Sequence, residues 1–485
     1  ESNKNEEVVI VSANRDKADQ NGADSEPAYS RFALPESSRA GTEIFTRKDI
    51  EAMHPRNVYD ILQQAKGLLV TYQGRKHPYF VYDRGGDSMG IILDGVYLPF
   101  TVASREVASI PVGLIESVKI VRDSTILTVA PMGTFASDQA APIQGFIIIT
   151  TRRSSAPETE LKFSYGTLNT KNYQIFTGDK KNNYYYDLAY NKAKTGGKDN
   201  WYNFSDSDSF FLRSGYKDKD VEGNISLFVD RTTMPFQRGI ENGVLSTAQW
   251  GYNPMDTTVL SLDAAKHWNS HNTTAFNFGY TNVDADFHGD TFGKDPVAVV
   301  NYRDYWREFN LWHTITAGRD TLKFGGQMLA WHTPNGDAYG KVEQHEKLYG
   351  YYLAGEHQVN NRLTVDGGLR IDKKHILTGT SDTGHAIDDQ WAQDGKTYSL
   401  GAAYKINPVY KLSTRFAYSH QPCNEFINKV RPFDDPEVRR KYEMGITANY
   451  NKTFNVDLTA FYYNIDNAKI LDHSTGSGLN TVNWG

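Results

Sequence analysis

From residue 159 onward, hydrophobic and polar positions alternate along the chain with a period of two. Residues 363–371, 410–418 and 454–462 place apolar side chains at every second position and mostly polar or charged ones between them. Side chains of a β-strand point alternately to its two faces, so each run predicts a strand with one apolar and one polar face. Counting such runs between residues 159 and 466 gives roughly fifteen strands. The pattern therefore predicts a mainly β chain.

The connections between these predicted strands alternate in length. Short turns at one end and long loops at the other are typical of a transmembrane antiparallel β-barrel, whose strands need about 9–11 residues each. A soluble sandwich or propeller does not need so strict an alternation, so the pattern favours the barrel. Aromatic residues gather at 184–186 and 462–463, near strand ends, as expected of an interfacial girdle. The expected short turns are 180–183, 318–320, 360–361 and 407–408, and the expected long loops lie near 195–206, 233–256, 284–302, 333–342, 375–395 and 421–437.

The stretch from residue 84 to 151 has a different character. Its runs at 91–96, 115–122 and 145–151 are rich in β-branched apolar residues, which favour strands. Asp94-Gly95 is a tight-turn signal inside the first run. We predict a small mixed sheet with long loops here, and no cradle for catalysis.

Two short helices are predicted before this sheet. Thr46 has the residue type of an N-cap, with Asp49 three positions later, for a helix that ends near Met53. Asn57 is expected to cap a second helix, with Gly67 as its stop. The apolar face of that second helix contains Val58, Ile61 and Leu62.

The composition agrees with a barrel that has a wet interior. Hydrophobic residues make up 39% of the chain, below the roughly 45–50% of ordinary globular proteins, while Gly (40), Tyr (30) and Phe (24) are abundant. The sequence has no run of about 18 apolar residues, so we expect no transmembrane helix. The single cysteine, Cys423, excludes an internal disulfide. A net charge of −6 with both signs interspersed argues against non-specific nucleic-acid binding.

Four motifs follow one another in the N-terminal part of the chain. They are Asp60-Ile61-Leu62 with Gly67, then Arg84-Gly85 followed by Ile92-Leu93-Asp94-Gly95-Val96, then Ile115-Glu116-Ser117-Val118 through Arg122, and finally Gly145 through Thr151. In this order, ahead of a long alternating region, they resemble the plug domain of TonB-dependent outer-membrane receptors. The resemblance covers most of 40–152, and the barrel pattern extends it to 485. The departures are Ala65 where the family commonly has proline, Asp123 where it has glycine, and the segment 124–141.

The resemblance implies the fold, the domains and the location. Residues 1–40 would be an N-terminal periplasmic segment, 41–153 an α+β plug inside the lumen, and 154–485 a barrel of the 22-strand type. Because 480–485 do not have the pattern of a closing strand, we expect the barrel to be incomplete. The protein would lie in the lipid of a bacterial outer membrane, with its plug and N-terminus facing the periplasm.

One apolar β-prone run lies within the polar N-terminal segment, at residues 6–13. By propensity alone it is either a strand added to a domain or a peptide offered to a partner by β-augmentation. The resemblance favours the second interpretation and implies a TonB box that pairs with the protein TonB. The residues of this expected TonB box are Glu7, Val8, Val9, Ile10, Val11 and Ser12.

The resemblance also implies ion pairs that hold the plug in the barrel. Arg84 and Arg122 match the family's plug arginines, and Glu443, within Tyr442-Glu443-Met444-Gly445, matches a barrel glutamate. Ser419-His420 stands where the family often has a further carboxylate, although Glu425 is close in sequence. The alternative is that both arginines are solvated residues of a wet lumen.

In the family, apical plug loops and the inner faces of extracellular loops bind the ligand. Arginines and aromatic rings there suit an anionic, aromatic chelate, so we expect import of a ferric siderophore. The alternatives are haem, cobalamin, an oligosaccharide, or a binding subunit without transport. For haem the candidates are His332, His375, His385 and His420, but the family's phenylalanine-arginine-alanine-proline motif is absent. The plug candidates for ligand binding are Arg84, Asp87, Ser88, Met89, Tyr97, Phe100, Arg105, Met132 and Phe135.

Catalytic chemistry finds little support in the sequence. Ser, His and Asp are present, but not in the arrangement of a nucleophile elbow or a metal site, so we expect neither an enzyme nor a cofactor. An outer-membrane esterase or protease is therefore disfavoured. Asp284, Asp286, His288 and Asp290 alternate in an expected loop and could bind a cation, but such loops are more often simply solvated. We predict no metal site.

Overall fold

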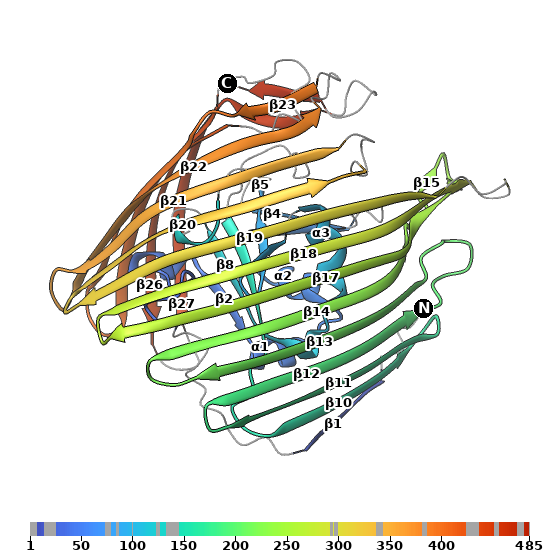
Figure 1. Cartoon of the computed structure of the whole chain (residues 1–485), viewed down its shortest axis with the longest axis horizontal. Helices are drawn as coiled ribbons and strands as arrows, with labels where there is room; N and C mark the ends of the chain where they lie inside the picture. The colour runs from blue at the N-terminus through green and yellow to red at the C-terminus, as the bar shows by residue number, and fades with distance from the viewer. Residues whose placement is uncertain are drawn as a thin grey trace.

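A large curved sheet surrounds a smaller N-terminal unit (Figure 1). The structure is a computed structural model, and it describes residues 7–13, 26–72, 79–83, 87–98, 100–122, 127–131, 145–291, 294, 299–335, 343–380, 386–422, 436–450, 455–472 and 480–484. Among these residues no helix has the length and apolar character needed to cross a membrane.

The large sheet is antiparallel and contains 17 strands, in the order β1-β10 and then through the chain to β27. β23 and β24 both pair with β22, along different stretches, so they act as one strand. Counted in this way, β10 to β27 confirm the predicted number of about fifteen. The strands are β1 (Glu7–Ala13), β10 (Glu158–Gly166), β11 (Thr170–Lys181), β12 (Tyr184–Thr195), β13 (Ser205–Lys217), β14 (Val221–Pro235), β17 (Ala248–Asn269), β18 (Asn272–Thr291), β19 (Val300–Ala317), β20 (Asp320–Thr333), β21 (Gln344–Gln358), β22 (Leu363–Thr380), β23 (Ala386–Trp391), β24 (Gly395–Lys405), β25 (Tyr410–Gln421), β26 (Glu437–Asn449) and β27 (Asn455–Asp466).

The two faces of this sheet have the polarity that a lipid-facing barrel requires. In β19, Phe309 and Leu311 are 42% and 46% exposed on the outer face, whereas Glu308 and Asn310 are 4% and 0% exposed on the inner face. An apolar outer face and a polar inner face are the reverse of a soluble sheet, and they suit strands that contact lipid outside and a polar interior inside. The predicted alternation is therefore confirmed, together with the direction of its apolar side.

The predicted short turns are confirmed, but three of the expected long loops are partly strand. β17 begins at Ala248, β18 continues to Thr291, and β22 continues to Thr380. The aspartate-rich run 284–290 therefore lies in a strand and not in a loop. Charges at every second position fit a strand with one polar face, and pairing with the neighbouring strands decides between strand and loop. Two hairpins lie outside the large sheet, β15 (Ile240–Glu241) with β16 (Val244–Leu245) and β28 (Ala468–Asp472) with β29 (Asn480–Trp484).

The N-terminal unit contains the predicted mixed sheet. Its order is β2-β8-β9-β6-β7, and β6 runs parallel to β9 while the other neighbours are antiparallel. Asp94 and Gly95 have φ angles of 47° and 85°, which confirms the tight turn between β6 and β7. The strands are β2 (Glu43–Thr46), β6 (Gly90–Leu93), β7 (Val96–Leu98), β8 (Ile115–Arg122) and β9 (Gly145–Thr151), and a second small sheet contains β3 (Leu68–Tyr72), β4 (Tyr79–Asp83) and β5 (Asp87–Ser88).

Both predicted helices are present. α1 (Arg47–Met53) begins with a capping box between Thr46 and Asp49, and Asn57 caps α2 (Val58–Leu62) through two backbone amides. Gly67 does not stop α2, which ends at Leu62; its φ of 74° instead turns the chain into β3. A third helix, α3 (Phe100–Glu106), was not predicted, because its first turn contains β-branched residues. The 3₁₀ turns are η1 (Glu36–Gly41), η2 (Val107–Ser109) and η3 (Val112–Leu114).

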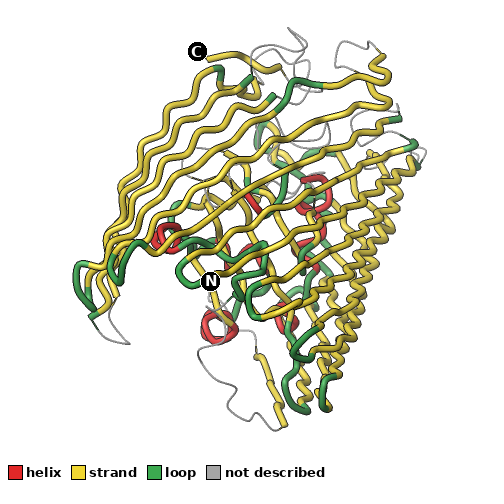
Figure 2. The backbone as a smooth tube through the Cα atoms, turned by 60° about the vertical axis from the view of Figure 1, so that its left-hand side comes forward, coloured by secondary structure: helices red, strands yellow, loops and turns green. Residues whose placement is uncertain are grey.

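One hydrophobic cluster joins the N-terminal unit to the large sheet. Ile92, Ile120 and Ile149 of the small sheet belong to the same buried cluster as Trp306 and Trp331 of the large one. Figure 2 shows the helices and the small sheet enclosed by the large sheet. The N-terminal unit is therefore packed against the inner face and occupies the interior.

Candidate functional site

The turn between β6 and β7 is tied to the inner face by a buried ion pair. Arg213 of β13 donates to Asp94 at 2.6 Å, and the two side chains are 0% and 5% exposed. Asp94 also accepts from the Thr151 amide at 2.9 Å, and Arg213 donates to the Arg152 carbonyl at 2.7 Å. Removing one partner of such a buried pair leaves an unpaired charge, which costs about 3–5 kcal/mol. This contact therefore holds the turn firmly against the wall.

A second buried contact joins the segment before β2 to β19. Arg31 lies 3.3 Å from Glu308, and it donates to the Val129 carbonyl at 2.7 Å. The other carboxylate oxygen of Glu308 accepts from the Tyr97 amide at 2.6 Å. Sequence reasoning missed Arg31, because a single arginine in a polar segment carries no local signal of its distant partner.

The described part of the atypical segment 124–141 also contacts the wall. Residues 127–131 are buried, and Arg370 of β22 donates to the Leu127 carbonyl at 2.7 Å. Gln327 of β20 donates to the Val129 carbonyl at 3.0 Å. These backbone acceptors dock the segment on the large sheet without a requirement for particular side chains.

Of the three expected latch residues, the structure describes Arg122 and Glu443. Arg122 forms ion pairs with Asp83 at 2.9 Å and Glu43 at 3.2 Å, both within the N-terminal unit. Glu443 accepts from the Tyr463 hydroxyl at 3.2 Å, and it lines the same small cavity as Arg122. Arg84 lies outside the described residues. The structure therefore brings Arg122 and Glu443 to one cavity and assigns Arg122 two carboxylates that the sequence did not indicate.

The expected ligand residues that the structure describes are buried. Met89, Tyr97 and Arg105 are 9%, 5% and 3% exposed. Tyr97 lies in β7, and Arg105 lies in α3 with its guanidinium 4.7 Å from the ring centroid of Tyr252. Tyr97 and Arg105 therefore lie in regular elements of the plug and not in its loops. Arg84, Met132 and Phe135 lie outside the described residues, as do the side chains of Asp87, Ser88 and Phe100, whose backbones lie in β5 and α3.

The apolar run near the N-terminus forms a strand. β1 pairs antiparallel with β10, from Glu7 opposite Tyr165 to Ala13 opposite Thr159, and it is an edge of the large sheet (Figure 1). In β-augmentation an extended segment adds to the free edge of a sheet through backbone hydrogen bonds. Residues 7–13 form such an added strand in this structure, so the run can form a strand as predicted.

His332, His375 and the aspartate-rich run have partners within the protein, whereas Nδ1 of His420 is buried without a hydrogen-bond partner among the described residues. His332 lies 2.8 Å from Glu343, and His375 lies 2.7 Å from Asp389. Asp284 accepts from Asn301 at 2.8 Å. Among the described residues, no group of three or more His, Cys, Asp or Glu side chains is arranged to hold a metal ion. His385 lies outside the described residues.

A buried pair of carboxyl groups joins α3 to β14. Glu106 is 2% exposed and Asp230 is 0% exposed, and Ser207 and Ser209 donate to Asp230 at 2.8 and 2.9 Å. Burial, followed by the charge of Asp230, raises the pKa of Glu106 well above its usual range. Two such groups in a dry contact cannot both ionise without a large cost, so the pair retains a proton.

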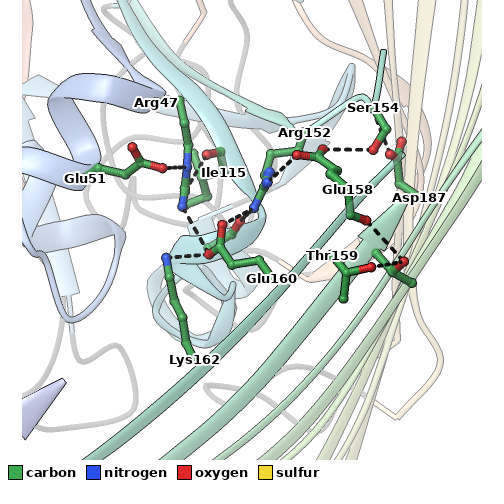
Figure 3. A network of polar contacts seen from close by, with 12 residues as sticks. Arg47, Glu51, Ile115, Arg152, Ser154, Glu158, Thr159, Glu160, Lys162 and Asp187 are labelled. Atoms are coloured by element: carbon green, nitrogen blue, oxygen red, sulfur yellow. Dashed lines mark hydrogen bonds and ion pairs between the residues drawn. The ribbon is translucent and has the colours of Figure 1, made fainter. Parts of the chain in front are cut away.

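A network of ion pairs connects α1, the segment after β9 and strand β10 of the large sheet (Figure 3). Arg152 contacts Glu158 at 2.9 Å and Glu160 at 3.0 Å, and Lys162 contacts Glu160 at 2.8 Å. Arg47 approaches Glu160 at 3.7 Å. Burial, with the charge of Arg152, lowers the pKa of Arg47. Glu160 is therefore shared by three cations from three segments.

Two family models account for most of the chain. The TonB-dependent receptor plug domain matches residues 35–132, and the TonB-dependent receptor-like β-barrel matches residues 156–483. The chain belongs to the TonB-dependent receptors. The N-terminal unit is the plug, the large sheet is the barrel wall, and both confirm the fold expected from the sequence. The family and the fold place the receptor in the outer membrane, and the matched families are receptors rather than enzymes.

Known proteins with similar sequences and structures agree on the fold. The vitamin B12 transporter BtuB of Vibrio vulnificus is 21% identical, over 88% of this chain and 68% of the relative. The pyoverdine-bound FpvA of Pseudomonas aeruginosa has a TM-score of 0.73 at 12% identity, covering 94% of this receptor and 68% of that chain. The alcaligin receptor FauA of Bordetella pertussis has a TM-score of 0.67 at 15% identity, covering 93% and 75%. The copper transporter OprC has a TM-score of 0.70 at 12% identity, covering 91% and 75%.

Proposed function

We propose that this receptor imports a ferric siderophore across the outer membrane, driven by TonB. The observation that carries the proposal is a plug held inside the barrel by buried ion pairs, of which Arg213 with Asp94 is the closest. A lumen filled in this way admits a large solute only if work is done on the plug. The outer membrane has no nucleotide supply, so a partner protein must supply the work by pulling.

The proposed mechanism has three steps. Ligand binds the outer face of the plug, through Arg84, Asp87, Ser88, Phe100, Met132 and Phe135. The TonB box, Glu7 to Ser12, is then released from its pairing with β10 into the periplasm, where TonB pairs with it by strand addition. Pulling acts through residues 1–40 on the plug, 41–153, which moves within the barrel, 154–485. Arg84, Arg122 and Glu443 form the latch that resists this movement. The receptor changes no covalent bond of its ligand.

Deleting residues 6–13 tests the energised step. We expect uptake of ⁵⁵Fe, supplied as chelates from iron-limited culture supernatant, to fall to the level of cells without the receptor, while surface binding is retained. A sharper pair of variants is Val9→Pro, which removes a backbone donor and disrupts strand pairing, and Val9→Thr, which retains β-branching. Uptake that survives both the deletion and Val9→Pro would contradict TonB-driven import.

Ligand capture tests the siderophore. The purified receptor is incubated with iron-limited culture supernatant, and the retained molecule is identified by mass spectrometry. Cyanocobalamin is the second ligand to test, because the similarity to a vitamin B12 transporter extends over 88% of this chain. An iron chelate in the bound fraction supports the proposal. The siderophore assignment is contradicted if the receptor retains cobalamin alone or retains no iron chelate.

A further inference from the structure

The outer face of strands β19 to β22, which lie side by side (Figure 1), changes from apolar to basic along its length. In the middle of these strands the outward side chains form an apolar band, in which Phe309 and Tyr351 are 42% and 54% exposed. One or two outward positions nearer to the long connections, the side chains are those of Arg307, Lys347 and His375. The apolar band is therefore bordered by cations at one end of the barrel.

Arg307 and Lys347 lie in one row across the sheet. Arg307 is opposite Ala330, and Ala330 is opposite Lys347. Neighbouring strands lie about 4.8 Å apart, so the backbones of the two cationic residues are roughly 10 Å apart. The short side chain of Ala330 between them leaves space in which the two long side chains can meet. His332 and His345 are opposite one another in the next row, with ring centroids 4.9 Å apart.

The two cations of this row have no protein anion beside them. Among the described residues, no carboxylate forms an ion pair with Arg307 or Lys347, whereas the neighbouring His332 lies 2.8 Å from Glu343. A cation on the lipid-facing wall is costly at depth but is tolerated near the interface, where its stem lies along apolar surface and its charge reaches the headgroups. The position of Arg307 and Lys347 at the border of the apolar band fits such an interface.

Strands β12 to β14 provide a comparison, because their outward cations near the long connections are paired. Lys192 contacts Asp206 at 2.5 Å, and Arg231 lies 3.6 Å from Asp256. The positive charge of that part of the wall is compensated within the protein. On β19 and β21 the compensating anion has to come from outside the protein.

The surroundings of the two cations indicate what kind of anion fits. Trp391, which is 54% exposed, stacks on His375 with ring centroids 4.2 Å apart and lies 6.0 Å from Tyr349. Exposed aromatic rings at this level are typical of the girdle at a membrane interface. A phosphate group suits the cations, because arginine binds it through two parallel N–H donors and lysine binds it as a point charge. Acyl chains attached to that phosphate group would continue along the apolar band.

We propose that Arg307 and Lys347 bind a phosphate group of an acylated glycolipid in the outer leaflet of the outer membrane. The long connections mark the extracellular end in barrels of this type, so the site faces that leaflet. The acyl chains lie over the apolar band that contains Phe309 and Tyr351. The site is on the outside of the wall, so lipid binding requires neither TonB nor the imported ligand.

Titration with diphosphorylated lipid A tests this site. The purified receptor in micelles of an uncharged detergent is titrated with the lipid, and bound lipid is counted by native mass spectrometry. We expect the double variant Arg307→Gln, Lys347→Gln to weaken binding about tenfold or more, because two attractive charges are lost. The control, Lys192→Gln with Arg231→Gln, removes the same number of charges from the paired part of the wall and should weaken binding less than about twofold.

Equal losses in the two double variants overturn the site, and so does unchanged binding in Arg307→Gln, Lys347→Gln. The exchange variant Arg307→Lys, Lys347→Arg retains both charges and should bind the lipid like wild type, and a loss there overturns the role of charge. Urea unfolding in the same detergent shows that all variants remain folded.

Two further probes separate the phosphate group from the acyl chains. Lipid A without its phosphate groups should bind the wild-type receptor as weakly as diphosphorylated lipid A binds Arg307→Gln, Lys347→Gln. Inorganic phosphate should not displace the bound lipid, because it makes no contact with the apolar band. Complete displacement by inorganic phosphate would show a site for a free anion and overturn the lipid assignment.

Discussion

The two sides of the plug differ in chemistry although their cavities are similar in size. The cavity beside β10 to β14 has a volume of about 660 Å³, and its wall combines amide and hydroxyl groups with the ion pairs around Glu160. The cavity beside β20 to β25 has a volume of about 680 Å³ and a wall of paired charges. Ion pairs therefore hold the plug on both sides. The side beside β10 to β14 differs in the buried amide atoms of Asn172, Gln174 and Asn191, which lack a hydrogen-bond partner among the described residues.

The chain before the plug runs along the side beside β20 to β25. Glu36 pairs with Lys411 at 3.1 Å, its amide donates to Glu356 at 2.6 Å, and Ser37 donates to Asp366. This segment connects the expected TonB box to β2. A pull on it therefore acts first on charged contacts at the barrel wall, and only then on α1.

The largest expected effect is at the buried pair between Arg213 and Asp94. Arg213→Ala leaves Asp94 unpaired in a dry contact, so we expect a loss of about 3–5 kcal/mol in plug stability, measured by urea unfolding in detergent micelles. The control is Arg303→Ala, whose partner Asp284 lies at 3.2 Å in a half-exposed pair worth at most about 1 kcal/mol. Equal losses in the two variants would contradict the role of buried charge in anchoring the plug.

The next effect concerns pH at the contact between Glu106 and Asp230. Because burial raises the pKa of Glu106, the folded protein keeps a proton that the unfolded chain releases above about pH 4.3, the ordinary value for glutamate. Stability is fully present below that pH and falls as the pH rises toward the folded pKa, by about 1.4 kcal/mol per pH unit. Glu106→Gln should remove this slope and be more stable than wild type at pH 8.

The control for that titration is Glu241→Gln, which changes an exposed glutamate of the β15–β16 hairpin in the same way. Unfolding curves in detergent at pH 5, 6, 7 and 8 provide the comparison. A pH slope that is the same in Glu106→Gln and wild type would show that the carboxyl pair does not hold a proton.

A smaller effect is expected at α1, the helix that carries Arg47 to the cavity beside β10 to β14. Thr46→Ala removes the capping box of α1 and should cost about 1 kcal/mol in stability. Thr46→Ser retains the capping hydroxyl and should cost only a few tenths of that amount. The same urea titrations measure both variants, and indistinguishable losses would mean that the cap does not stabilise α1.

The smallest effect on stability is expected at the buried amides of the cavity beside β10 to β14. Asn191→Leu removes a buried amide oxygen that lacks a partner among the described residues, so the stability should change by less than about 1 kcal/mol. On the other side of the plug, Lys374→Leu removes the buried ion pair with Glu346 at 3.0 Å and should cost several times more.

Local patterns in the sequence were sufficient for most of the elements. The period-two alternation predicted the strands of the barrel, and Asp94-Gly95 predicted the turn between β6 and β7. Thr46 and Asn57 predicted the starts of α1 and α2. Each of these signals depends on residues within a few positions of one another, because strand faces, turns and caps are made by neighbouring residues. α3 escaped prediction because its β-branched residues favour a strand when taken alone.

Only the tertiary structure decided which side chains meet. Arg213 and Asp94 are 119 residues apart, and Arg31 and Glu308 are 277 apart, so no local pattern joins them. Tyr97 and Arg105 had the chemistry of ligand residues, and only packing against the barrel revealed that they are buried. The two cavities likewise follow from where the plug lies in the curved sheet. The sequence by itself determined the strands, turns and caps, because those depend on neighbours, while the tertiary structure alone determined the ion pairs and cavities, because those depend on how distant segments pack.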